Sequence, residues 1–422
     1  MHILQKKNLA VIIGNALEYY DFMLYGFFAF ILAPLFFPTD NPSLSLIASM
    51  GSYGVGFLAR PLGGIFFGHL GDRWGRKDTL SLSILLVSIP TIGIACLPSY
   101  EHIGMWAPLL LVFFRILQGF CLGGETSGAI TYFIENAKPN EKDIASSWIV
   151  LSCYVGTLAG TILGSIFTLS FMPSWGWRIT FVIGSLIAVI GYYIRQKLKE
   201  TPEFIACKKQ GKILKIPLIE LLKNEKTNLF LSSCVSSAVI IPFFIIFIYL
   251  NGLMKLKFQL EAPLLLLLNA GLMIFWILLL PVFGFLSQTY GRKKVMQAGL
   301  LGLSVFSYPL FLLVSSVPSL ESILLTQIIL SIFAMAFSAP SSAFLVELFP
   351  VAERFSGIAF GYSLGHAIFG GLTPILLTTL VQAYEFTHAP VLFLVFCSLL
   401  GSLALQKPSF FARHVEATQP LT

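Results

Sequence analysis

The chain has 422 residues, a formal net charge of +7, 56% hydrophobic residues and only 11% charged residues. Soluble domains carry about 25% charged residues, so this composition predicts a protein built for the lipid bilayer. Twelve spans of about 20 residues leave no room for a soluble catalytic domain. Most of the 27 Lys and Arg fall in alternate loops, which orients membrane proteins and argues against nucleic acid as a partner.

Twelve apolar segments follow one another along the chain. They are predicted at residues 9–36, 44–70, 79–97, 106–134, 144–170, 178–196, 228–250, 262–287, 295–316, 321–348, 356–382 and 389–405. The expected fold is all-α, with a six-helix bundle at 1–196, a basic linker at 197–226, a second six-helix bundle at 227–407 and a short tail at 408–422. The basic loops place both termini and the linker in the cytoplasm.

A ten-residue phrase at 68–77, GHLGDRWGRK, returns at 284–293 as GFLSQTYGRK. Duplicated membrane bundles are typical of transporters, whose substrate site lies between the halves. Glycines recur every four residues in the fifth and eleventh spans, at Gly156, Gly160 and Gly164 and at Gly357, Gly361 and Gly365. We expect seams there, where the two halves approach and slide, with static packing as the alternative.

Ionisable residues inside the spans are candidates for function, because each buried charge costs about 2.5–3.5 kcal/mol. Helical spacing puts three groups on single faces: Asn15, Glu18, Asp21 and Tyr25 in the first span, Tyr53 and Arg60 in the second, and Arg115, Gln118 and Glu125 in the fourth. The expected depths bring the acids close to Arg115. A proton entering one carboxylate would then free the guanidinium, although a static ion pair is the alternative.

The repeated phrase predicts a cytoplasmic gate. Asp72 can pair with a basic group or a helix N-terminus in one conformation and lose that partner in another. Gln288 occupies the matching place in the second copy, so we expect a weaker contact there. The predicted gate residues are Asp72, Arg73, Arg76, Glu135, Arg292, Glu347 and Arg354, and further cavity candidates are Asn269, Gln327, Tyr362 and His366.

No enzyme motif, phosphate loop or metal-ligand spacing of the six Cys is present in the sequence. We therefore expect no metal and no cofactor, only a proton as coupling ion. The expected partners are a small-molecule substrate and the lipid bilayer, and the chain is expected to function as a monomer.

The motifs resemble those of the major facilitator superfamily, and within it the metabolite:H⁺ symporter family. The resemblance rests on GNALEYYDF at 14–22, RILQGF at 115–120 with GGE at 123–125, GWR at 176–178, ETPEF at 200–204 and ELFP at 347–350. It implies uptake of a small polar metabolite with a proton across a bacterial-type inner membrane. Family members carry proline and betaine, 2-oxoglutarate, citrate or shikimate. The implied site residues are Glu18, Asp21, Arg115 and Glu125, with Asp72 and Arg76 at the gate.

Two other functions stay open from the sequence. One is a proton-coupled exporter or exchanger of drugs or metabolites, which the same fold would support. The other is a membrane sensor that binds its ligand without transporting it. A small carboxylate substrate fits the acids and arginines of the first, second and fourth spans better than a bulky cation does.

Overall fold

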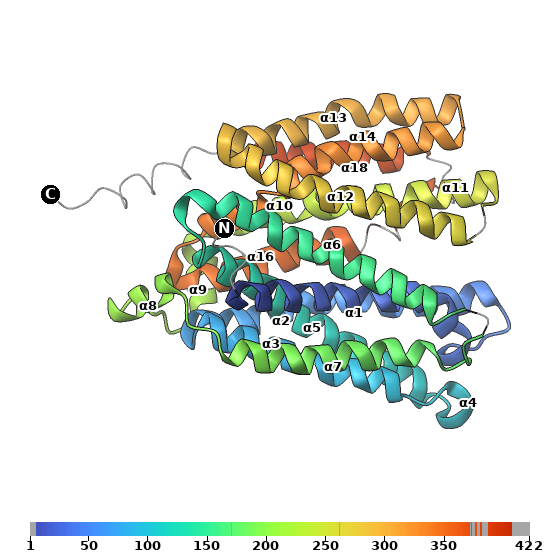
Figure 1. The fold of residues 1–422 in the computed structure, drawn as a ribbon, viewed down its shortest axis with the longest axis horizontal. Coiled ribbons are helices and arrows are strands. Elements are labelled where there is room, and N and C mark those ends of the chain that lie inside the picture. Colours follow the sequence, from blue (N-terminus) through green and yellow to red (C-terminus); the bar gives the residue numbers. More distant parts are fainter. Residues whose placement is uncertain are drawn as a thin grey trace.

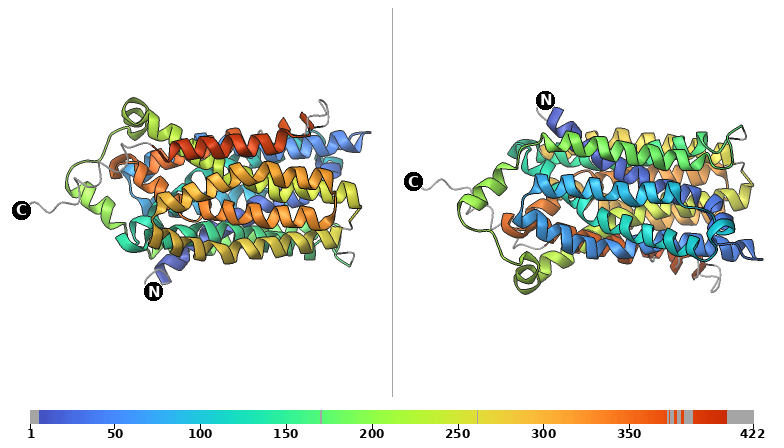
Figure 2. Two further views of the ribbon diagram at one scale, coloured as in Figure 1. Left: turned by 90° about the horizontal axis from the view of Figure 1, so that it is seen from above. Right: turned by 90° about the horizontal axis from the view of Figure 1, so that it is seen from below.

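The structure is a computed structural model that describes residues 6–169, 171–260, 262–371, 373, 376–377, 380–381 and 387–406. The predicted tail at 408–422 and part of the predicted eleventh span lie outside these residues. Long helices run side by side along the longest axis (Figures 1 and 2). The first half contains α1 (Lys6–Phe36), α2 (Pro42–Arg73), α3 (Arg76–Cys96), α4 (Tyr100–Ile103), α5 (Trp106–Glu135), η2 (Pro139–Glu141), α6 (Lys142–Ile166) and α7 (Trp177–Gln196).

The second half repeats this arrangement of spans. Its seventh span is interrupted by a π-helical turn and so has three parts, and its tenth and eleventh spans have two parts each. In order, the elements are α10 (Lys226–Phe243), η3 (Phe244–Tyr249), α11 (Leu250–Phe258), α12 (Ala262–Tyr290), α13 (Arg292–Ser316), α14 (Leu320–Ser338), α15 (Ser341–Leu348), η4 (Val351–Glu353), α16 (Arg354–Gly365), η5 (His366–Gly371) and α18 (Ala389–Ala404).

Nine helical segments of the described chain are long and apolar enough to cross a membrane. The shorter apolar helix α18, together with α2 and the α16–η5 segment, completes the twelve predicted spans. Helices suit the interior of a membrane because each helix satisfies its own backbone hydrogen bonds where no water is available.

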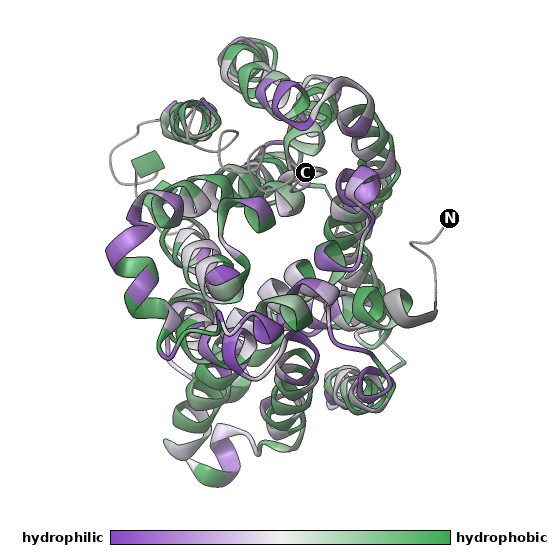
Figure 3. Cartoon of the chain, turned by 90° about the vertical axis from the view of Figure 1, so that its left-hand side faces the viewer, coloured by the Kyte–Doolittle hydropathy of each residue, from purple (hydrophilic) through white to green (hydrophobic). Residues whose placement is uncertain are grey.

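The predicted polar linker folds into two short helices, α8 (Pro202–Lys209) and α9 (Pro217–Asn224). Both lie at one end of the molecule, which we call the linker end, and α4 lies at the far end (Figure 1). The start of α1 and the end of α18 are also at the linker end. Figure 3 looks onto this end and shows hydrophilic stretches around the near ends of largely hydrophobic helices.

Equivalent helices make the contacts between the two halves. Within the first half α2 packs on α5, α1 on α6 and α3 on α7, and within the second half α10 packs on α16 and α13 on α14. Between the halves, α2 packs on α16 and α12 packs on α6. Because α12 is the counterpart of α2 in the repeat and α16 is the counterpart of α6, the two contacts are related by the internal symmetry.

The predicted glycine seams lie inside the halves and not between them. A Cβ on Gly156 would lie 1.8 Å from the carbonyl oxygen of Ala16 in α1, and one on Gly365 would lie 2.5 Å from that of Ser233 in α10. The seam between the halves uses Gly64, where a Cβ would lie 2.4 Å from the carbonyl oxygen of Ala359 in α16. The expectation of sliding faces at the fifth and eleventh spans is therefore wrong, because those glycines bring helices of one half together.

Each copy of the repeated phrase contains a glycine that starts a helix in a backbone conformation unfavourable to other residues. Gly75 precedes α3 with φ of 135°, and Gly291 precedes α13 with φ of 95°. Glycine adopts positive φ without the steric cost that a Cβ brings. The repeat thus preserves the same tight turn at the linker end of both halves.

Gly156→Ala should reduce the stability of the first half, because its methyl group overlaps the backbone of Ala16 and forces α1 and α6 apart. We expect a melting temperature several degrees lower in detergent and less monodisperse protein on size exclusion. Gly51→Ala is the matched control, since a Cβ there meets no atom within 4 Å. Equal melting temperatures for the two variants would contradict the close packing of α1 on α6.

Candidate functional site

The polar stripe of α1 is buried and faces three neighbouring helices. Asn15 donates a hydrogen bond from Nδ2 to Ser152 Oγ at 2.8 Å and so binds α1 to α6. Tyr25 lies under the guanidinium of Arg115, with 4.3 Å from Cζ to the ring centroid. Glu18 and Asp21 lie between them along the helix. Each of these two carboxylates has its own set of partners.

Asp21 and Arg115 are joined through Gln118. Asp21 Oδ2 accepts hydrogen bonds from Thr91 Oγ1 at 2.6 Å and from Gln118 Nε2 at 2.7 Å. Arg115 Nη1 donates to Gln118 Oε1 at 2.8 Å. The amide of Gln118 therefore links acid and guanidinium in a chain that ties α1, α3 and α5 together.

Glu18 and Glu125 are paired with two other arginines. Glu18 Oε1 lies 3.9 Å from Arg60 Nη2 and accepts a hydrogen bond from Thr126 Oγ1 at 2.6 Å. Glu125 Oε1 lies 2.5 Å from Arg195 Nη2. The expectation that the acids share Arg115 is wrong for Glu18 and Glu125, because each has a nearer cation, whereas Asp21 is linked to Arg115 through Gln118. Arg195, which lies at the end of the predicted sixth span and was not singled out from the sequence, is fully buried in α7.

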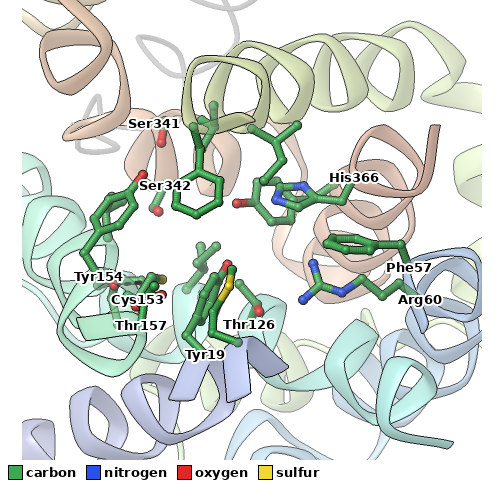
Figure 4. A pocket seen from close by; sticks show the side chains of 18 residues that line it. Tyr19, Phe57, Arg60, Thr126, Cys153, Tyr154, Thr157, Ser341, Ser342 and His366 are labelled. Carbon is green, nitrogen blue, oxygen red and sulfur yellow. Dashed lines mark hydrogen bonds between the residues drawn. The ribbon is translucent and has the colours of Figure 1, made fainter. Parts of the chain in front are cut away.

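A central cavity lies between the two halves (Figure 4). The first half contributes Arg60, which is the one formally charged side chain among the described residues that line it. Its walls are aromatic and hydroxylated. The aromatic residues are Tyr19, Phe57, Tyr154, Phe243 and Tyr362, the hydroxyl groups belong to Thr126, Thr157, Ser341 and Ser342, and His366 adds an imidazole. A solute with a carboxylate and a compact apolar body fits this chemistry.

Two predicted cavity residues have a different place. Gln327 donates from Nε2 to Asn251 Oδ1 at 2.9 Å and to the carbonyl oxygen of Ile246 at 2.8 Å, within the π-helical η3. Asn251 in turn donates from Nδ2 to Asn269. Gln327 of α14 thus holds η3 and the adjoining α11, and Asn269 of α12 holds α11. Neither lines the central cavity, whereas the predicted Arg60, Tyr362 and His366 do.

Asp72 connects the two halves at the linker end. Its carboxylate accepts hydrogen bonds from the backbone N–H groups of Phe355 at 3.0 Å and Ser356 at 2.8 Å, in the first turn of α16. Arg76 lies 2.9 Å from the same carboxylate. A negative charge at a helix N-terminus is favourable because the backbone dipoles point their positive end toward it.

A chain of alternating charges continues from Arg76 across the halves. Arg76 Nη2 donates to the carbonyl oxygen of Val351 at 2.6 Å, and its Nε lies 3.5 Å from Glu135. Glu135 pairs with Arg354 at 2.9 Å, and Arg354 also pairs with Glu203 of α8. The linker helix is therefore part of the contact that holds the halves together here. Arg73 is exposed and lies outside this chain.

The second copy of the phrase makes its contact with a different acid. Arg292 Nε lies 2.5 Å from Asp143 Oδ1 in the first turn of α6, and Arg292 also pairs with Glu347. Ser287 donates to Asp143 at 3.0 Å, whereas Gln288 is exposed. Sequence reasoning missed Asp143. In the repeat Lys142 corresponds to Arg354, so Asp143 corresponds to Phe355. Phe355 donates its backbone N–H to Asp72, and this correspondence is the signal for Asp143 in the sequence.

Comparisons with known proteins agree with this arrangement of fold and cavity, which defines a multi-span membrane transporter. A model described as "Sugar (and other) transporter" matches residues 7–215, and one described as "Major Facilitator Superfamily" matches residues 267–420. The "Glycine betaine/proline/ectoine/pipecolic acid transporter OusA" of Dickeya dadantii is 31% identical, over 95% of this chain and 82% of its own length. The "Putative proline/betaine transporter" of Staphylococcus aureus is 32% identical, over 95% and 87%.

Solved structures show the same fold. The proton:xylose symporter XylE bound to 6-bromo-6-deoxy-D-glucose superposes with a TM-score of 0.78 at 18% identity, over 95% of this chain and 94% of that one. The inward-open conformation of the xylose transporter from E. coli has a TM-score of 0.64 at 17% identity, over 94% and 93%. The chain belongs to the major facilitator superfamily, and its resemblance to the metabolite:H⁺ symporters is confirmed.

Asp72→Asn should weaken the closed linker end, because the amide removes the charge that faces Arg76 and the N-terminus of α16. We expect a cost of about 2 kcal/mol, roughly 30-fold in the equilibrium between closed and open forms. Ser342→Cys, which lines the cavity, in a protein whose six native Cys are replaced by Ser, should then react faster with a maleimide added from the linker end. Asp78→Asn is the control because Asp78 is exposed, and equal reactivity in both would exclude Asp72 as a gate residue.

Glu353 in η4 should make the stability of the folded protein depend on pH. Its carboxyl is buried, and this burial, together with Glu225, Asp72 and Glu220 nearby, raises its pKa from 4.5 to about 7. The folded state then binds more protons than the unfolded state between these values, so stability falls as pH rises from about 4.5 to about 7. Melting temperatures from pH 5 to 8 should lose this slope in Glu353→Gln. An unchanged slope would assign it to another group.

Proposed function

We propose that this chain is a proton-coupled symporter of a small carboxylate-bearing solute, such as a proline- or betaine-like zwitterion, working by alternating access. The names of the relatives support the class of solute. The observation that carries the proposal is the position of Arg60, which lines the central cavity and also pairs with Glu18. One guanidinium therefore faces both the space for a substrate and a carboxylate that can accept a proton.

Competition for Arg60 provides the coupling. While Glu18 is ionised it holds Arg60, and a substrate carboxylate in the cavity must displace it. A proton on Glu18 removes this competitor and leaves Arg60 for the substrate. The linkage is reciprocal, so a bound carboxylate also favours the protonated form of Glu18. Proton and solute then bind together and leave together, as symport requires.

Asp21 provides a second carboxylate within the first half. A proton on Asp21 would replace an ionic acceptor with a neutral acid in the chain through Gln118 to Arg115. This chain joins α1, α3 and α5, so the change would alter how these helices hold one another. Glu125 is different because Arg195 compensates it directly, and we assign this pair to holding α5 on α7.

The linker end is the cytoplasmic end in this proposal. Basic residues gather in the linker and in the loops beside it, which is the bias of cytoplasmic loops in a bacterial inner membrane. We assign residues 1–196 and 227–407 to the two bundles and 197–226 to the linker, with the proton as coupling ion and the monomer as functional unit. The contacts of Asp72, Arg354 and Arg292 then close the cytoplasmic side, and they must break for substrate release.

Glu18→Gln should separate transport from the proton gradient. The neutral amide resembles the protonated acid, so Arg60 stays available for the substrate but no proton is bound. In proteoliposomes we expect exchange of labelled proline or glycine betaine to persist. Accumulation driven by an inward proton gradient should fall at least tenfold, to near the level seen with a protonophore.

Glu101→Gln is the matched control, because Glu101 is an exposed acid in α4 at the far end. Arg60→Gln should abolish both exchange and accumulation, since the cavity then lacks its cation. If Glu18→Gln still accumulates solute with full dependence on the proton gradient, the competition for Arg60 is not the coupling step.

A further inference from the structure

His366 occupies a defined place on the wall of the central cavity. It begins η5, where the eleventh span changes from α- to π-helical winding, and its side chain is buried. Its ring packs against that of Tyr362, with 4.3 Å between centroids and an angle of 39° between the ring planes. Figure 4 shows the His366 ring on the same side of the cavity as Arg60, with Phe57 next to both. The imidazole and the guanidinium therefore border the same part of the cavity.

Ser236 of α10 determines which nitrogen of the ring has the hydrogen. Ser236 Oγ lies 2.7 Å from the carbonyl oxygen of Tyr362, which can only accept, so the single hydroxyl hydrogen belongs to that bond. The same Oγ lies 2.5 Å from His366 Nδ1. With its hydrogen already used, Ser236 must accept there, and Nδ1–H is the donor. In the neutral ring this leaves the lone pair on Nε2.

Nε2 is the nitrogen left for a ligand. Within the part of the chain that the structure describes, His366 makes its side-chain hydrogen bond through Nδ1 to Ser236, and no protein donor is found at Nε2. A hydrogen-bond acceptor beside a guanidinium suits a molecule with a carboxylate and an N–H donor close together. An α-amino acid has both groups on one carbon, the Cα, which separates the ammonium nitrogen from the carboxylate carbon.

We propose that His366 Nε2 accepts a hydrogen bond from the ammonium N–H of a bound amino-acid zwitterion while Arg60 binds its carboxylate. This inference rests on the proposed function and specifies its substrate class. His366 thereby selects zwitterions with at least one N–H, of the proline type, over fully N-methylated zwitterions of the betaine type. A quaternary ammonium has no hydrogen to donate and would leave Nε2 without a partner.

Two substitutions separate the two nitrogens of the ring. In His366→Asn the side-chain amide reaches about as far as Nδ1, so it can still donate to Ser236 but offers no acceptor at the place of Nε2. In His366→Gln the amide reaches about as far as Nε2, and its oxygen can accept there. If His366 served only to hold η5 in place, its substitution would affect two ligands that differ only in N–H equally.

The test is binding of L-proline and N,N-dimethyl-L-proline to the full-length protein in detergent, by thermal shift and by competition with labelled proline. These ligands share the ring and the carboxylate and differ at nitrogen. We expect His366→Asn to weaken proline roughly 10- to 100-fold, the effect of losing a hydrogen bond to a charged group, and to change dimethylproline less than threefold. His366→Gln should regain part of the proline affinity. Melting temperatures without ligand check that both variants fold.

Equal weakening of both ligands in a folded His366→Asn protein would overturn the selective role and assign His366 to the packing of η5. Unchanged affinity for both would overturn it as well. If the unmodified protein binds neither ligand, the proposed function fails together with this inference. If it binds proline and accumulates it with protons but His366→Asn keeps the proline preference, only the inference fails.

Discussion

Burying charge in a bilayer requires a partner for every charge, and this requirement organises the first half of the molecule. An uncompensated charge costs several kcal/mol, so each buried acid has either a cation or a set of hydrogen-bond donors. Glu125 has Arg195, Glu18 has Arg60 and Thr126, and Asp21 has Thr91 and Gln118. These pairs differ in one respect that matters for transport. Only the Glu18–Arg60 pair has a member on the wall of the central cavity.

The same requirement explains the closed linker end. Asp72 is buried, and its compensation comes from Arg76 in its own half and from the backbone of α16 in the other half. Separating the halves there would remove part of this compensation unless water enters. Hydration of the interface is thus a condition for opening, which fits a contact at the edge of the membrane and not at its centre.

Much of the fold could be predicted from the sequence, because the signals are local. Span lengths follow from apolar runs, and the stripe of Asn15, Glu18 and Asp21 follows from helical spacing. The partners could not be predicted, since they depend on how separate helices pack. Arg195 lies at the end of its predicted span and Asp143 directly before its predicted span, and the sequence does not indicate that they pair with Glu125 and Arg292. A polar residue such as Gln327 can face a cavity or satisfy a π-helical carbonyl, and its sequence context is the same in both cases.

The distribution of the interface carboxylates between the two halves has a consequence for how the halves recognise each other. The first half supplies both carboxylates, Asp72 from α2 and Asp143 from α6, and the second half supplies neither. If two copies of the first half paired with each other, Asp72 of one would meet Asp143 of the other, and like charges would repel. Two copies of the second half would lack the carboxylates at these positions. Complementary charge therefore favours the mixed pair and disfavours self-association of separated halves.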